Sequence, residues 1–100
     1  MRNKQLYRTK LPLQSKTRLD LPVGAKIYEV VADYEGGYSL LYLASPNVRT
    51  QLRVFEVHFV GDIVENTDDL IYIGTIIKHE QQDGTPMEAR LGLVFERLLP

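Results

Sequence analysis

Glu56 and His58 are the residues in this chain with the clearest potential for metal chemistry. They are two positions apart in a segment that alternates like a β-strand, so both side chains are expected on one face. A zinc site needs three or four ligands, and His79 from a neighbouring strand could supply a third. The same spacing is also common on ordinary strand surfaces, and we favour that interpretation. Thiolate ligands are excluded because the chain has no cysteine.

An acidic segment follows, and carboxylate oxygens are the ligands that Ca²⁺ and Mg²⁺ prefer. Its spacing lacks the alternating ligands and central glycine of a calcium loop, which favours a solvated loop. The candidates are Asp62, Glu65, Asp68 and Asp69.

Nucleophilic catalysis has weaker support. Ser39 or Ser45 could be combined with His58 and an aspartate, but neither serine lies in the G-x-S-x-G context of a nucleophile elbow. The glycine-containing turns precede no Lys-Ser/Thr pair of a phosphate-binding loop. The sequence therefore predicts no enzymatic activity, no metal and no cofactor.

Basic residues are concentrated at the N-terminus: six Lys and Arg residues precede the first acidic residue, Asp20, and the remaining six face thirteen Asp and Glu. Alternate positions of the first strand form a strip that could contact phosphates, with an aromatic ring available for stacking. The pI of about 6.1 argues against a dedicated nucleic-acid binder, and a charged edge strand that discourages aggregation is the simpler interpretation. The candidate residues are Arg2, Lys4, Tyr7, Arg8 and Lys10.

Tyrosines gather around the glycine pair Gly36-Gly37. Tyr34 and Tyr38 flank this pair, and Tyr42 follows four positions later. Tyrosine combines an apolar body with a polar tip and is enriched at interfaces. Ordinary cross-strand packing is the alternative explanation. We predict a surface for a partner or for self-association at Tyr34, Tyr38 and Tyr42.

Strands with turns about every ten residues must position these side chains. Residues 6–13 form a weak strand that should lie at an edge or end near Pro12, and Gln14-Ser15 suits a hairpin into the next strand. Residues 26–34 and 38–44 form a hairpin around Gly36-Gly37. The second of these strands is apolar on both faces, which predicts a central position.

The C-terminal half continues the pattern. Residues 50–60 form a long strand whose alternation changes phase, so we expect a β-bulge near Val54–Phe55. Gly74 predicts a bend or a close contact in the strand of residues 70–79. An Asp-Gly turn then leads to a last strand, although residues 87–99 also fit a short helix.

These elements predict a single all-β domain over residues 1–100, built as a small antiparallel β-sandwich or open barrel of about seven strands. The hydrophobic fraction of 44% is that of a globular domain. No segment has the continuous apolar run of a signal peptide or a membrane span. We therefore expect a cytoplasmic protein.

Three landmarks in order carry a resemblance: Leu21–Ile27 (LPVGAKI), Tyr72–Thr75 (YIGT) and Val94–Glu96 (VFE). Together they resemble a family of short uncharacterised proteins of phages, prophages and plasmids. Its members start with a basic, Tyr-containing strand and often carry Gly-Thr-Gly-His-Pro before the Y-I-G-T strand. That turn is absent here, where residues 56–62 read EVHFVGD. The resemblance implies a mobile-element protein that acts inside a bacterial host cell.

We conclude with two hypotheses from the sequence. The first is a non-enzymatic protein-binding module that modulates a host protein, with a host or phage protein or a second copy of the chain as partner. The alternative is binding of a nucleotide or single-stranded nucleic acid through the basic N-terminal strand.

Overall fold

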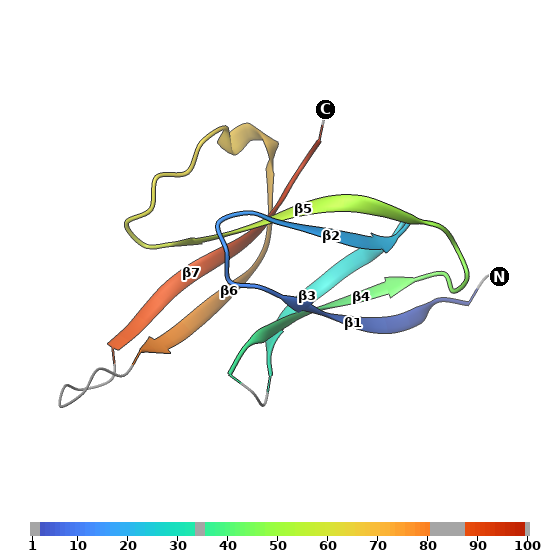
Figure 1. Cartoon of the computed structure of the whole chain (residues 1–100), viewed down its shortest axis with the longest axis horizontal. Helices are drawn as coiled ribbons and strands as arrows, with labels where there is room; N and C mark the ends of the chain where they lie inside the picture. The colour runs from blue at the N-terminus through green and yellow to red at the C-terminus, as the bar shows by residue number, and fades with distance from the viewer. Residues whose placement is uncertain (1–2, 34–35, 81–87, 100) are drawn as a thin grey trace.

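The computed structural model describes residues 3–33, 36–80 and 88–99, which fold as two antiparallel sheets (Figure 1). The three-stranded sheet has the order β1-β4-β3, and the four-stranded sheet has the order β2-β5-β7-β6. The strands are β1 (Gln5–Leu11), β2 (Thr17–Pro22), β3 (Lys26–Ala32), β4 (Tyr38–Ala44), β5 (Thr50–Phe59), β6 (Leu70–Glu80) and β7 (Glu88–Arg97). A 3₁₀ helix, η1 (Thr67–Asp69), precedes β6. The predicted all-β class is confirmed, and β7 takes the place of the alternative C-terminal helix.

The core lies between the two sheets. Alternate residues of β4 point into it, as do Phe55 and Val57 of β5, because side chains of a strand alternate between faces. The buried members are Leu11, Leu21, Ala25, Leu40, Tyr42, Ala44, Phe55, Val57, Ile76 and Val94. Strand β4 is the middle strand of its sheet, as its apolar faces predicted.

The predicted hairpin around the glycine pair is confirmed as β3 and β4. Gly36 has a φ of +84°, a backbone angle that side-chain-bearing residues resist. The Asp33 N–H donates to the carbonyl of Gly37 at 2.8 Å and closes the turn.

Strand β1 ends at Leu11 and pairs only with β4, so the edge position predicted from Pro12 is confirmed. The hairpin predicted at Gln14-Ser15 is wrong, because β1 and β2 belong to different sheets. The carbonyl of Gln14 accepts a hydrogen bond from the Val57 N–H at 3.2 Å. The segment after Pro12 therefore leads the chain from one sheet to the other.

The β-bulge predicted near Val54–Phe55 is also wrong. Strand β5 pairs with both neighbours without a register shift, and its residues 54–57 are all buried. The apparent change of phase arises because Glu56 is only 4% exposed, so both faces of β5 are covered at this point. Irregular pairing occurs instead between Ile27 and Glu29 in β3, and between Tyr72 and Gly74 in β6.

Strands β3 and β6 are edge strands of different sheets, and they lie side by side along what we call the seam. A Cβ on Gly74 of β6 would lie 3.1 Å from Val30 Cγ2 of β3, so the strands touch there, as the close contact predicted at Gly74 requires. Further along, the Tyr38 hydroxyl donates to the carbonyl of Ile77. Tyr38 belongs to β4 and pairs with Ala32 near the end of β3, so the order Val30–Gly74 and then Ala32–Ile77 shows that β3 and β6 run in the same direction along the seam.

Candidate binding groove

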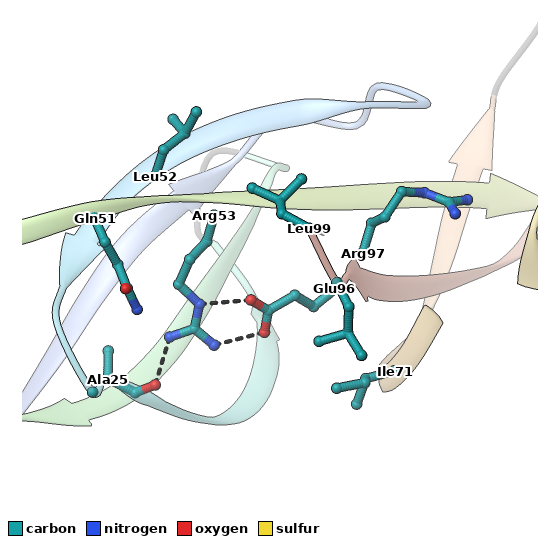
Figure 2. A pocket seen from close by; sticks show the side chains of 10 residues that line it. Ala25, Gln51, Leu52, Arg53, Ile71, Glu96, Arg97 and Leu99 are labelled. Carbon is teal, nitrogen blue, oxygen red and sulfur yellow. Dashed lines mark hydrogen bonds and ion pairs between the residues drawn. The ribbon is translucent and has the colours of Figure 1, made fainter. Parts of the chain in front are cut away.

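Arg53 and Glu96 form a bidentate ion pair on the inner face of the four-stranded sheet. Arg53 Nε donates to Glu96 Oε2 and Arg53 Nη2 donates to Glu96 Oε1, both at 2.6 Å. Arg53 Nη1 donates to the carbonyl of Ala25 at 2.5 Å, which joins the pair to the start of β3 (Figure 2). The two side chains are only 15% and 14% exposed. The pair therefore ties the ends of the two sheets together.

Two adjoining hollows, of about 490 and 410 Å³, open at this ion pair and share Ala25, Arg53, Ile71 and Glu96 in their linings. Large apolar side chains surround them, and each is between 46% and 54% exposed. We call this site the apolar groove, and its rim consists of Tyr28, Leu52, Ile71, Leu98 and Leu99. Tyr72 also lines the second hollow, but its ring packs against Phe95 on the outer face of the sheet and its hydroxyl lies 2.6 Å from that of Thr75. Figure 2 shows Leu99 on one side of the ion pair and Ile71 on the other, with Arg97 pointing away.

Local strand geometry explains the position of these side chains. Arg53 has the same parity as Phe55 and Val57, so it points between the sheets, and Ile71 pairs with Glu96 across β6 and β7. The two irregularities lie at Tyr28 and Ile73, both of which line the second hollow. Bulges bend a strand and re-aim its side chains. The two edges that face the groove are therefore the two irregular ones.

The chemistry of the groove is apolar recognition around a neutral polar centre. Each nitrogen of the Arg53 guanidinium and each oxygen of the Glu96 carboxylate already has a partner. A charged ligand at this ion pair would lose its water without gaining an unpaired opposite charge from it. The charged Lys26 also lines the second hollow, where its Nζ lies 5.1 Å from the centre of the Tyr28 ring. An uncharged group would cover the half-exposed side chains, with a gain of about 1 kcal/mol for each.

A second Arg–Glu pair joins the same two strands on the opposite face. Arg97 of β7 donates through Nε and Nη2 to the carboxylate of Glu56 of β5, and His58 Nε2 lies 2.8 Å from Glu56 Oε1. Arg97 also donates to the carbonyls of Glu65 at 2.7 Å and Asn66 at 3.0 Å. We call Glu56, His58 and Arg97 the Glu56 cluster. It fastens the connection between β5 and η1 to the sheet.

The Glu56 cluster is electrostatically matched. The hydrogen bond from Arg97 lowers the pKa of Glu56 most, desolvation by burial opposes it, and the bond to His58 lowers it further. Glu56 therefore stays a carboxylate inside the fold.

The predicted pairing of Glu56 and His58 on one strand face is thus present as a side-chain contact of 2.8 Å between His58 Nε2 and Glu56 Oε1. The side chain of His79 lies outside the described residues. No group of three His, Asp or Glu side chains able to hold a metal ion occurs among the residues that the structure describes. In the acidic segment, Asp62 Oδ2 accepts from the Phe59 N–H at 2.8 Å.

The serines considered for catalysis lie in other surroundings. Ser39 is buried in the three-stranded sheet and donates to Asp33 Oδ1 at 2.9 Å. His58 belongs to the four-stranded sheet, with its side chain on the outer face beside Phe95. The structure does not bring Ser39 and His58 together.

Of the tyrosine surface predicted at residues 34, 38 and 42, the structure contradicts the place of Tyr42. Tyr42 is 7% exposed and belongs to the core, where it stacks on Tyr7 with ring centroids 5.5 Å apart. Burial raises the pKa of the Tyr42 hydroxyl, and the nearby Tyr7 adds to this. Tyr38 is half-buried and bound to Ile77 across the seam, and Tyr34 lies outside the described residues. Cross-strand packing, the alternative explanation, applies to Tyr7 and Tyr42.

The basic strip is split by the fold. Lys4, Arg8 and Lys10 have the parity of the outer face of β1, whereas Tyr7 points inward onto Tyr42. Arg8 is paired with Asp33, whose side chain is 5% exposed. Arg2 lies outside the described residues. An aromatic ring is therefore not presented beside the three described basic residues.

The groove residues were not singled out from the sequence. One indication was present, because Arg53 interrupts an apolar strand. Strand β5 carries Arg53 and Glu56, and β7 carries Glu96 and Arg97. Such complementary pairs would match across two antiparallel strands. Knowing that β5 and β7 are neighbours was the missing step.

The fold and the groove define a class: a small all-β protein built as an open two-sheet sandwich, with an apolar groove at one end of its seam. A family model described as a domain of unknown function (DUF7352) matches residues 2–83, and the chain belongs to that family. The match includes Arg53 and Ile71, and it stops before β7, which supplies Glu96. Comparisons with curated proteins and with solved structures found no match. Within the described residues, none of the helical segments has the length and apolar character needed to cross a membrane.

Proposed function

We propose that this chain is a non-enzymatic protein-binding module and that it binds its partner through the apolar groove. The observation that carries the proposal is the gathering of five half-exposed apolar side chains around an ion pair in which each guanidinium nitrogen and each carboxylate oxygen has a partner. Ligand sites typically combine apolar walls with a few fixed polar groups. Contiguous exposed apolar surface marks interaction sites.

The overall shape supports the proposal. The radius of gyration of the whole chain is 15.2 Å, against about 13 Å for a compact domain of this length. Its extents are 55 × 33 × 18 Å, so the two sheets form a thin, open body. A thin sandwich leaves apolar side chains at its ends incompletely covered, and a partner can complete their burial.

The setting that we propose is a bacterial cell that carries a phage or another mobile element, where the partner is a host or phage protein. Support comes from the ordered landmarks LPVGAKI, YIGT and VFE, which resemble those of short phage, prophage and plasmid proteins. Membership of a family of unknown function agrees with this without naming a partner.

The test is a pair of double variants with the same charge change. Ile71→Glu/Leu99→Glu places two carboxylates in the groove, whereas Val60→Glu/Ile63→Glu places them at side chains that are 82% and 89% exposed outside it. Both tagged variants and the parent chain are used to capture proteins from the host cell, and captured proteins are identified by mass spectrometry. We expect one partner with the parent chain and the control, and its loss with the groove variant.

The melting temperature of each variant shows that it is folded. Equal capture by the groove variant and the control would reject the groove as the binding site. A change of solution mass between the parent chain and the groove variant would identify the partner as a second copy. Binding of single-stranded oligonucleotides that Lys4→Ala/Lys10→Ala abolishes would instead support the nucleic-acid alternative.

A further inference from the structure

We propose that the partner supplies an extended segment that adds as a strand at the seam, along the edge of β6 at residues 70–73. The segment would be uncharged and would carry apolar side chains at alternate positions. This inference rests on the proposed protein-binding function and specifies how binding occurs.

The first argument is the unpaired backbone at the seam. Among the described strands, β6 pairs only with β7 and β3 only with β4, so each has one edge without a described neighbouring strand in its sheet. The Tyr38 hydroxyl reaches the carbonyl of Ile77, which shows that the free edge of β6 faces the three-stranded sheet. An exposed edge of this kind is a template for another strand.

The second argument is the length of open edge. The Val30–Gly74 contact closes the middle of the seam, and the groove opens on the N-terminal side of it. Four residues of β6, Leu70 to Ile73, lie there, which corresponds to roughly 13 Å of strand. This edge accommodates one short extended segment.

The third argument distinguishes an extended segment from a second folded copy. A stable dimer needs about 800 Å² of surface from each partner. The groove is bounded by β3 on one side and by β6 on the other, and its floor is the Arg53–Glu96 pair. A single extended chain can enter between two strands, whereas a flat face of another domain cannot.

The fourth argument is charge. Because Arg53 and Glu96 satisfy each other, the floor of the groove is neutral and rewards uncharged side chains. In an added strand, alternate side chains point to the same side, so one set would face Ile71 and the ion pair while the other faces away. The expected pattern in the partner is therefore apolar residues with a period of two.

The experiment selects nine-residue peptides from a displayed random library on the intact protein. We expect enriched peptides with alternating apolar residues, bound by the parent chain and by Val60→Glu/Ile63→Glu but not by Ile71→Glu/Leu99→Glu. The best peptide is then synthesised with single N-methylated amides at successive positions. Methylation at alternate positions should weaken binding at least about fivefold, because it removes a backbone hydrogen bond, and methylation between them should change it less than twofold.

Three results would overturn strand addition, and they separate it from the proposed function. N-methylation without an alternating effect means that the groove binds side chains alone, and protein binding stands. Failure to enrich any peptide, while partner capture still depends on Ile71 and Leu99, means that the groove needs a folded partner. Loss of both peptide binding and groove-dependent capture rejects both proposals.

Discussion

Two Arg–Glu pairs link β5 and β7, one on each face of the four-stranded sheet. Strand β5 supplies the arginine of one pair and the glutamate of the other. On the outer face, Glu56 of β5 pairs with Arg97 of β7, and the chain's own connection between β5 and η1 covers them. On the inner face, Arg53 of β5 pairs with Glu96 of β7, and the groove above them stays open. The two arginines are equally buried, each with 15% of its side chain exposed, and the pairs differ at the glutamate, which is 5% exposed in Glu56 and 14% in Glu96.

The two pairs differ in which backbone carbonyls accept the further hydrogen bonds of each arginine. Arg97 donates to the carbonyls of Glu65 and Asn66, so it holds the connection between β5 and η1 against the sheet. Arg53 donates a further hydrogen bond to the carbonyl of Ala25, and no segment of the described chain closes over Ile71 and Leu99. We conclude that the outer pair stabilises the fold, whereas the inner pair shapes a site for another molecule.

The largest expected effect comes from breaking the outer pair. Arg97→Met keeps much of the side-chain volume but leaves the buried Glu56 carboxylate without its main partner, and an unpaired buried charge is costly. It also releases the two carbonyls that Arg97 binds. We expect the melting temperature to fall by more than about 10 °C, as measured by circular dichroism.

The double variant Glu56→Met/Arg97→Met is the control for that prediction. Replacing both members of a buried ion pair with apolar groups is often close to neutral. The double variant should therefore melt above the single one. A single variant that melts like the parent chain would contradict the assignment of Arg97 as the fastener of this connection.

A smaller effect is expected for the inner pair. Arg53→Met leaves Glu96 at the open groove, where water can solvate it, so the free energy of unfolding should fall by about 1–3 kcal/mol in urea denaturation. Peptides or partners that use the groove should lose affinity as well, because the link to Ala25 positions the start of β3. If Arg53→Met proves more destabilising than Arg97→Met, the proposed distinction between the two pairs is incorrect.

Local patterns were sufficient for the strands and for their class. Alternation of side chains and the glycine pair predicted β3, β4 and their turn, because these depend on neighbours within a few residues. The same patterns could not assign strands to sheets. The Gln14-Ser15 connection is short enough for a hairpin, yet β1 and β2 separate because each has a more distant partner, β4 and β5.

Long-range contacts account for the errors at the candidate sites. Glu56 was taken as a surface residue because its partner Arg97 is 41 positions away. With Glu56 assigned to the surface, the change of phase in β5 was explained by a bulge that the structure does not contain. Tyr42 has the parity of Leu40 and Ala44, which favoured the core over a surface. The apolar groove combines residues from β3, β5, β6 and the end of the chain, and no single segment of sequence contains it.

The smallest expected effect is the pH dependence of stability that Glu56 gives to the outer pair. The pKa of Glu56 is lowered in the folded protein, first by the hydrogen bond from Arg97. A lowered pKa means that the carboxylate contributes stability above its ordinary value of 4.5, and that this stability is lost as pH falls through the lower folded-state pKa. The titratable and charged side chains that face it are His58 and Arg97, with Glu65 and Asp69 beside Arg97.

Glu56→Gln removes this titration while it keeps the size of the side chain. We expect the parent chain to be more stable than Glu56→Gln at pH 6, and the difference in free energy of unfolding to shrink steadily below about pH 4.5. Urea denaturation at a series of pH values measures it, with Glu96→Gln as the matched variant of the inner pair. A difference that stays constant down to pH 3 would show that the charge of Glu56 adds nothing to its hydrogen bonds. The outer pair would then stabilise the fold through geometry alone.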